Sequence, residues 1–229
     1  MNPPYKTAVV AGASGLVGSH VLQMLLDSNA YTEVISIGRR QLPLQHPKLK
    51  QSEADFMDLP NGLIPPFSDV FCALGTTIRN AGSQEQFVRV DYDFIVHLAK
   101  AAANARASKF LLVSALGADA QSSIFYNKIK GQTEEAIQLL PISQIHIFRP
   151  SLLLGDRTES RMGEMLGKVF AFALSPFLVG SWKKYKAIKA LDVAKAMYKC
   201  AQISHEGVHI YESDRIAHIA ENESKNTIA

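Results

Sequence analysis

The chain has 229 residues, of which 47% are hydrophobic, and a formal net charge of +3. This length suits one α/β domain, with or without a small appendage. The charge is too mild for a nucleic-acid binder, whose surface is typically strongly basic on one face. Cys72, Cys200 and the seven histidines show no metal-ligand spacing, so we expect no metal site and a reducing, cytoplasmic location. The longest apolar stretch, residues 169–180, contains Pro176 and is too short to span a membrane.

Strand-like and helix-like stretches alternate along the first 150 residues. Short apolar and β-branched runs predict strands at 7–11, 33–37, 69–73, 110–114 and 142–148. Helical patterns occupy 16–26, 123–140 and a long stretch from Ser83 to about Ala105, where Ser83 and Gln86 fit a capping box. Residues 41–66 contain five prolines and give no clear pattern. The repeated strand–helix units predict a doubly wound α/β fold of the Rossmann type, with helices on both faces of a parallel sheet.

The pattern weakens after Pro150. Residues 191–201 and 213–220 read as helices and 208–211 as a short strand. Because ligands bind beyond the carboxyl ends of the strands in such sheets, we expect residues 151–229 to cover that end and shape a substrate pocket. No linker rich in glycine or serine separates them, so we treat residues 1–229 as one domain.

Three glycines, Gly12, Gly15 and Gly18, come after the first predicted strand. Gly12 permits a tight turn, Gly15 lets the backbone approach a pyrophosphate, and Gly18 lets the helix pack closely on the strand. The N-terminus of the helix then offers free N–H groups to the phosphates. Such a triplet also occurs in ordinary turns, but its place between the first strand and the first helix favours a dinucleotide site.

The second predicted strand ends in Ile37-Gly38-Arg39-Arg40. NAD-preferring domains carry a carboxylate here, which bonds the ribose 2′-hydroxyl, and this chain has none. Two guanidinium groups suit a 2′-phosphate instead. The sequence therefore predicts NADP(H) as cofactor, with a pair of solvated arginines as the alternative.

Tyr126 and Lys130 are four residues apart on a predicted helix and share one face of it. A tyrosine of ordinary pKa, about 10, is a poor acid–base group at neutral pH, and a nearby ammonium favours the phenolate. Ser114 ends the preceding strand and could orient a substrate carbonyl. Ser122 and Ser123 are alternatives, although they more plausibly cap the helix. We expect Ser114, Tyr126 and Lys130 to be catalytic.

Across residues 7–220 the chain resembles the atypical short-chain dehydrogenases/reductases, in particular the Tat-interacting-protein group of NADPH-binding oxidoreductase-like proteins. The resemblance rests on Gly12-Ala13-Ser14-Gly15, Ile37-Gly38-Arg39-Arg40, Cys72-Ala73-Leu74-Gly75-Thr76-Thr77, Phe87-Val88-Arg89-Val90-Asp91, Gly117-Ala118-Asp119, Phe148-Arg149-Pro150 and Asp156-Arg157-Thr158-Glu159-Ser160-Arg161. It implies cofactor contacts at Ser14, Gly15, Leu16, Val17, Arg39, Arg40, Leu74, Gly75, Tyr126 and Lys130, with Leu153 and Arg161 beside the nicotinamide half. Many extended members of the class carry asparagine in the fourth helix where this chain has Arg89, so we expect a different proton-relay network.

These observations predict an NADP(H)-dependent oxidoreductase acting on a small-molecule carbonyl or alcohol. The alternative is a non-catalytic NADPH-binding regulator that contacts a protein partner. The basic and aromatic segment Trp182–Lys186 is interpreted as a solvated loop rather than a nucleic-acid or membrane contact, and residues 169–178 as a segment packed over the substrate cleft.

Overall fold

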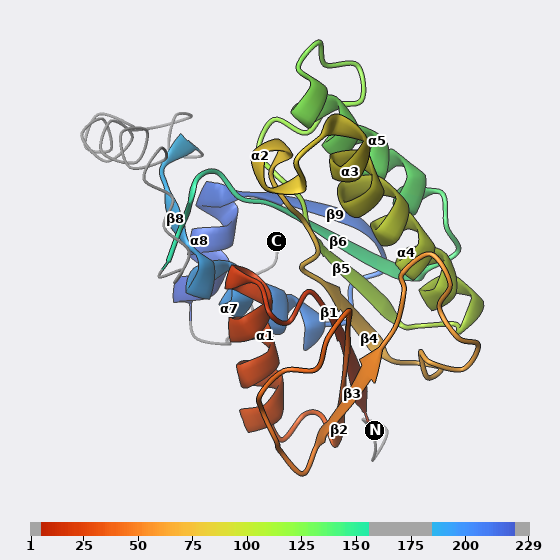
Figure 1. Ribbon diagram of the computed structural model, residues 1–229. Coiled ribbons are helices and arrows are strands. Elements are labelled where there is room, and N and C mark those ends of the chain that lie inside the picture. The colour runs from red at the N-terminus through yellow and green to blue at the C-terminus, as the bar shows by residue number, and fades with distance from the viewer. Residues whose placement is uncertain (1–5, 156–184, 223–229) are drawn as a thin grey trace.

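The computed structural model describes residues 6–155 and 185–222 (Figure 1). Our expectations for Arg161, for residues 169–178 and for residues 182–184 lie outside the described residues. None of the helices within the described ranges is both long enough and apolar enough to cross a membrane.

Seven parallel strands form the central sheet, in the order β3-β2-β1-β4-β5-β6-β9. They are β1 (Thr7–Ala11), β2 (Glu33–Gly38), β3 (Leu49–Glu53), β4 (Asp69–Cys72), β5 (Lys109–Val113), β6 (Gln144–Arg149) and β9 (Gly207–Glu212). The central strands β4 and β5 are buried at every position, as expected for strands covered on both faces. The order of the first six strands is that of the Rossmann fold, so the predicted doubly wound parallel sheet is confirmed.

Helices cover both faces of this sheet (Figure 1). On one face, α1 (Leu16–Asp27), α7 (Ala190–Ala201) and α8 (Ser213–Glu221) bury a cluster that includes Leu111 and Val113 of β5. On the other face, α4 (Phe94–Asn104) and α5 (Phe125–Gln138) bury a cluster that includes Phe110 and Leu112. Successive side chains of a strand point to opposite faces, so the residues of β5 are shared between both cores.

The predicted long helix from Ser83 to Ala105 is interrupted. It consists of α3 (Gln84–Val88), a π-helical turn (Arg89–Asp93) and α4, and the short α2 (Ile78–Ala81) precedes it. Ser83 is the N-cap of α3, and its Oγ accepts a hydrogen bond of 3.2 Å from the amide of Gln86. The predicted start of the helix is therefore confirmed, and the π turn is a feature that the hydrophobic periodicity did not reveal.

The C-terminal residues complete the sheet and its helical layer. After β6 the short strand β7 (Leu153–Leu154) pairs with β8 (Ile188–Lys189) in a separate two-stranded sheet. The chain then forms α7, which packs against α1, and β9, which joins the main sheet beside β6. The end of β7 lies beside the start of α1, since a Cβ on Gly155 would be 2.6 Å from Cδ1 of Leu16. Residues 190–221 thus belong to the body of the domain.

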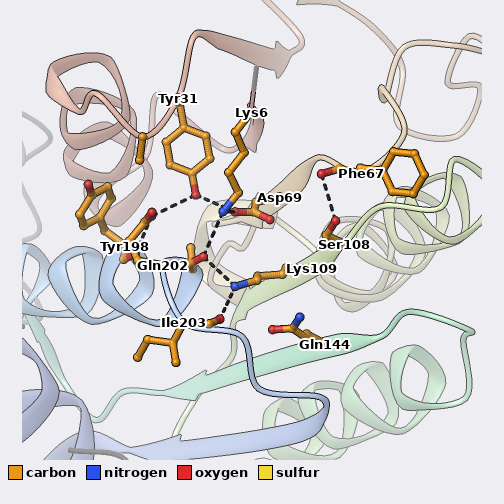
Figure 2. A network of polar contacts seen from close by, with 12 residues as sticks. Lys6, Tyr31, Phe67, Asp69, Ser108, Lys109, Gln144, Tyr198, Gln202 and Ile203 are labelled. Atoms are coloured by element: carbon orange, nitrogen blue, oxygen red, sulfur yellow. Dashed lines mark hydrogen bonds and ion pairs between the residues drawn. The ribbon is translucent and has the colours of Figure 1, made fainter. Parts of the chain in front are cut away.

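A buried polar network lies at the amino edge of the sheet (Figure 2). The Asp69 side chain, at the start of β4, is fully buried; its Oδ2 accepts a hydrogen bond of 2.7 Å from the Tyr31 hydroxyl and lies 2.6 Å from Nζ of Lys6. Lys6 and Lys109 both donate to the carbonyl oxygen of Ala201, at 3.2 and 2.7 Å. The network thereby ties the C-terminus of α7 to the start of three strands.

We expect Tyr31→Phe to destabilise the protein, because the buried Asp69 carboxylate would lose a hydrogen-bond donor without gaining access to water. A hydrogen bond to a charged group typically contributes about 1.5–3 kcal/mol. Urea denaturation measures the loss, with Tyr92→Phe, at a half-buried tyrosine, as the matched control. Equal unfolding free energies for the two variants would contradict this account of the network.

Candidate functional site

Two loops meet at the carboxyl edge of the sheet, where the strand order reverses. The β1 loop (residues 12–15) leads to α1 on one face, and the β4 loop (residues 73–77) leads to the helices on the other face. They are joined where the amide of Ala73 donates a 2.9 Å hydrogen bond to the carbonyl of Ala11. Ligands of open α/β sheets bind at such a reversal point, so this crevice is the candidate site.

The β1 loop is packed too closely for any side chain at two glycines of the predicted motif. Gly12 has φ of +87°, in the left-handed region, and a Cβ there would lie 2.5 Å from the carbonyl oxygen of Ala73. A Cβ on Gly18 would lie 2.1 Å from the carbonyl oxygen of Gly12. Gly12 and Gly18 therefore have the turn and the close helix–strand contact that the sequence predicted for them.

The N-terminus of α1 opens toward the crevice. Gly15 is the N-cap, no side chain caps the helix, and its first turn contains no acidic residue. Ser14 is exposed and Gly15 and Leu16 are half-buried, whereas the side chain of Val17 belongs to the core. Among the described residues, no side-chain cap and no carboxylate of the first turn competes for the backbone N–H groups of this turn, and these groups fit the pyrophosphate of a dinucleotide.

The β4 loop forms the opposite wall. Leu74 packs against the core under α4. A Cβ on Gly75 would approach Oδ1 of Asp91 to 3.3 Å and Nζ of Lys130 to 3.5 Å. Gly75 therefore lies directly over two charged side chains, one of which is a predicted site residue.

Arg39 lines a cavity of about 520 Å³ beyond the ends of β2 and β3. The other lining residues are Glu53, Ala54, Asp55, Gln86, Arg89, Val90 and Phe94. Arg40 is exposed and is not among them. The Arg89 guanidinium lies 4.0 Å from Oδ2 of Asp55 and over the Phe94 ring, 5.6 Å from its centroid. Arg89 thus faces this cavity and not the Tyr126–Lys130 pair.

Tyr126 and Lys130 occupy successive turns of α5. Tyr126 is half-buried, with its ring 5.4 Å from that of Phe87. Lys130 is buried, with Nζ 2.7 Å from Oδ1 of Asp91. Burial alone would lower the pKa of Lys130, but Asp91, followed by Tyr126 and Cys72, raises it above the ordinary lysine value. Lys130 is therefore an ammonium. Its partner Asp91 is a residue of the candidate site that the sequence analysis did not single out, although it stands in one of the segments that carry the resemblance.

Ser114 is hydrogen-bonded to a carboxylate within the protein. Its buried hydroxyl donates a hydrogen bond to Glu134, which lies one turn beyond Lys130 on α5. Glu134 is 1% exposed and also accepts two hydrogen bonds of 3.0 Å from Nε of Arg149, and this bonding raises the pKa of Arg149. Of the alternatives, Ser122 accepts a bond of 3.2 Å from the Ile124 amide, just before α5, and Ser123 is exposed.

The segment before α5 is fixed by another close approach. A Cβ on Gly131 would lie 2.1 Å from the amide nitrogen of Ala120. The amide of Asp119 donates a hydrogen bond of 3.1 Å to the carbonyl of Asn127. These contacts hold the first turns of α5, and with them Tyr126, against the loop that comes after β5.

Leu153 is half-buried in β7 and packs against the core that contains α1. Over the described ranges, no three His, Cys, Asp or Glu side chains are grouped so that they could hold a metal ion.

Comparison with known proteins identifies the family of this chain. The sequence model of an NAD(P)H-binding family matches residues 12–138. Protein HTATIP2 of Rattus norvegicus is 35% identical over 224 residues, which cover 95% of this chain and 90% of that protein. The mitochondrial protein fmp52 of Emericella nidulans is 36% identical over 171 residues, covering 71% of this chain and 73% of that protein.

Solved structures share the fold at lower sequence identity. The Bordetella bronchiseptica enzyme WbmH in complex with NAD⁺ has a TM-score of 0.69 and 18% identity, and covers 95% of this chain and 80% of its own. Human epimerase family protein SDR39U1 with NADPH has a TM-score of 0.61 and 20% identity, and covers 90% of this chain and 74% of its own. The chain therefore belongs to the NAD(P)H-binding atypical short-chain dehydrogenases/reductases, in the group that contains HTATIP2 and the FMP52 proteins.

Proposed function

We propose that the protein is an NADP(H)-dependent oxidoreductase that acts on a carbonyl or alcohol group of a small molecule. The observation that carries the proposal is the placement of Tyr126 and Lys130 on one face of α5, with the Lys130 ammonium 3.5 Å from the Cβ position of Gly75 in the wall of the dinucleotide crevice. A tyrosine beside an ammonium at this place is suited to proton transfer.

The cavity beside Arg39 supports NADP(H) over NAD(H). It lies where the second strand ends, which is the position of the adenosine ribose in dinucleotide-binding sheets. A guanidinium donates paired hydrogen bonds to a phosphate. Arg39 and Arg89 both line the cavity, together with the carboxylates of Glu53 and Asp55. Arg89 lies 4.0 Å from Asp55, so Arg39 is the arginine available to a phosphate. The human SDR39U1 structure, a distant relative in fold, contains NADPH.

Each part of the crevice has its own role in this reaction. When bound, the reduced nicotinamide supplies a hydride to the carbonyl carbon. Tyr126 donates its phenolic proton to the carbonyl oxygen as negative charge develops there. Lys130 stabilises the resulting phenolate by its charge and donates a hydrogen bond to the ribose. The uncapped N-terminus of α1 would hold the pyrophosphate.

One observation favours the alternative function, an NADPH-binding regulator that contacts a protein partner. A serine hydroxyl has a single proton to donate, and that of Ser114 is directed to Glu134. Ser114 can orient a substrate carbonyl only if this bond breaks, and a regulator has no need for such a group. The two functions differ in whether turnover exists and depends on Tyr126.

Two variants at the glycine motif distinguish an effect on cofactor binding from an effect on folding. Gly15→Val should weaken NADPH binding at least about tenfold while the protein keeps a cooperative melt. A Cβ there lies 3.1 Å from the Gly12 carbonyl oxygen, a tight contact that a small shift of the backbone relieves, and a side chain would crowd the turn proposed to bind the pyrophosphate. Gly18→Val should instead lower the melting temperature sharply, since its Cβ meets backbone at 2.1 Å. Calorimetric titration and thermal melts test both variants. Full NADPH affinity in Gly15→Val would show that the loop is only a turn.

NADPH should bind at least about tenfold more tightly than NADH, since each hydrogen bond to a charged group contributes about 1.5–3 kcal/mol. Arg39→Ala should remove most of that preference, and Arg40→Ala less, because Arg39 lines the cavity and Arg40 does not. Fluorescence titration with both cofactors measures the ratio, and Arg106→Ala, at an exposed arginine between α4 and β5, is the control. Equal affinity for the two cofactors in the unmodified protein would refute the assignment.

Tyr126→Phe should reduce turnover by about 10²–10⁴-fold, the usual contribution of an acid–base group, and leave NADPH affinity nearly unchanged. A panel of aldehydes, ketones and quinones, monitored by the loss of NADPH absorbance, identifies a substrate, and Tyr92→Phe serves as the control. Turnover that survives Tyr126→Phe would exclude this mechanism. Tight NADPH binding with no turnover across the panel would favour the regulator.

A further inference from the structure

Asp91 is a fully buried carboxylate beside the candidate site, a place where a charged side chain is unusual. It lies in the π-helical turn Arg89–Asp93, between α3 and α4, and its side chain is completely buried. A buried carboxylate is stable only when it is paired and hydrogen-bonded. Single π turns inside helices are frequent at functional sites. Its partners therefore indicate what the carboxylate does.

Asp91 connects three parts of the structure. Its Oδ1 lies 2.7 Å from Nζ of Lys130 on α5, and its Oδ2 accepts a hydrogen bond of 2.8 Å from the amide of Thr76 in the β4 loop. Its carbonyl oxygen accepts a further bond of 2.7 Å from Oγ1 of Thr133 on α5. Asp91 thus fixes α5 and the β4 loop to the π turn at the same time.

The ion pair of Asp91 and Lys130 forms the floor beneath Gly75. A Cβ at Gly75 would lie 3.3 Å from Oδ1 of Asp91 and 3.5 Å from Nζ of Lys130. The position of the Lys130 ammonium in the crevice wall is therefore set by the carboxylate that holds it. Any side chain at residue 75 would press on both charges.

The charge of Lys130 needs a counter-ion because the side chain is almost fully buried. Desolvation can lower the pKa of a buried lysine to about 5–6. Asp91, Tyr126 and Cys72 are the titratable groups that act on Lys130. Burial raises the pKa of the Cys72 thiol to about 12, so it is neutral at physiological pH. Asp91 is therefore the anion that keeps Lys130 protonated.

We propose that Asp91 is a positioning residue whose carboxylate holds the Lys130 ammonium beneath the β4 loop, ready for the ribose and for Tyr126. The inference rests on the proposed function only for the roles given to Lys130. The pairing itself is a property of the chain without cofactor. It also explains why Arg89 does not take part, because its guanidinium faces Asp55 and Phe94 instead.

Asp91→Asn removes the negative charge of the side chain but keeps its size, and its amide oxygen can still accept the hydrogen bond from the Thr76 amide. The titration of Lys130 is observed in cofactor-free protein by the ¹³Cε chemical shift of labelled lysines, with Lys130→Met to assign the signal. We expect no titration below about pH 10 in the unmodified chain and a midpoint at least about two pH units lower in Asp91→Asn. Asp93→Asn, at a half-buried carboxylate of the same π turn, should leave the midpoint unchanged. An unshifted midpoint in folded Asp91→Asn would overturn the proposal.

A second variant keeps the test decisive if Asp91→Asn does not fold. Asp91→Asn combined with Lys130→Met leaves no unpaired buried charge, so it should fold when Asp91→Asn alone does not. If the double variant is equally unfolded, the unpaired charge of Lys130 is not what prevents Asp91→Asn from folding, and the proposal is wrong.

Cofactor binding separates this inference from the proposed function. Calorimetry at pH 7 and pH 9.5 should show about tenfold weaker NADPH binding at the higher pH for Asp91→Asn, as Lys130 loses its proton, and little change for Asp93→Asn. A shifted Lys130 midpoint in a chain that binds no NADPH would refute the proposed function and leave the role of Asp91 intact. A shifted midpoint with NADPH affinity that is independent of pH would show that Lys130 does not contact the cofactor, and would overturn the part of the proposal that concerns the ribose.

Discussion

The contact between the β1 and β4 loops is the constraint on which the rest of the site depends. At this point the carbonyl groups of Gly12 and Ala73 lie so close to neighbouring backbone that no methyl group fits at Gly12 or Gly18. The contact fixes the N-terminus of α1 relative to the β4 loop, and therefore the width of the crevice. Helix termini bind phosphate by geometry more than by side-chain chemistry, so this backbone contact supplies most of what a pyrophosphate requires.

Two ion pairs, one buried and one with a partly exposed arginine, fix α5 relative to the sheet. Lys130 pairs with Asp91 on the π turn, and one helical turn later Glu134 pairs with Arg149 at the end of β6. Replacing one partner of a buried pair typically costs more than the pair contributes, because an uncompensated charge remains. The two pairs therefore give α5 a single position on the sheet. Tyr126 lies on the same helix, so the ion pairs of Lys130 and Glu134 also fix the position of Tyr126.

Much of the fold could be predicted from the sequence because burial on both faces makes strands such as Asp69–Cys72 and Lys109–Val113 almost continuously apolar. The strand Leu49–Glu53 escaped prediction because it is an edge strand in which Leu49 is the only apolar residue, and its pattern resembles a loop. The site was predicted in part. The spacing of Gly12, Gly15, Gly18, Tyr126 and Lys130, and the place of Arg39 after the second strand, predict candidate residues that the fold brings to the carboxyl edge of the sheet. The partner of Ser114 instead depends on which face of the sheet the serine occupies at the end of β5, and a short strand leaves that open.

Asp91 could not be found by spacing for a physical reason. An α-helix places successive residues about 100° apart, so a helical pattern read from Ser83 to Ala105 assigns one continuous face to the whole stretch. The π turn at Arg89–Asp93 inserts the equivalent of one residue and rotates the α4 helix relative to α3. This shift brings Asp91 under the β4 loop, while Arg89 faces the cavity beside Arg39. One irregular turn thus places a cation at the cavity beside Arg39 and an anion beside Lys130.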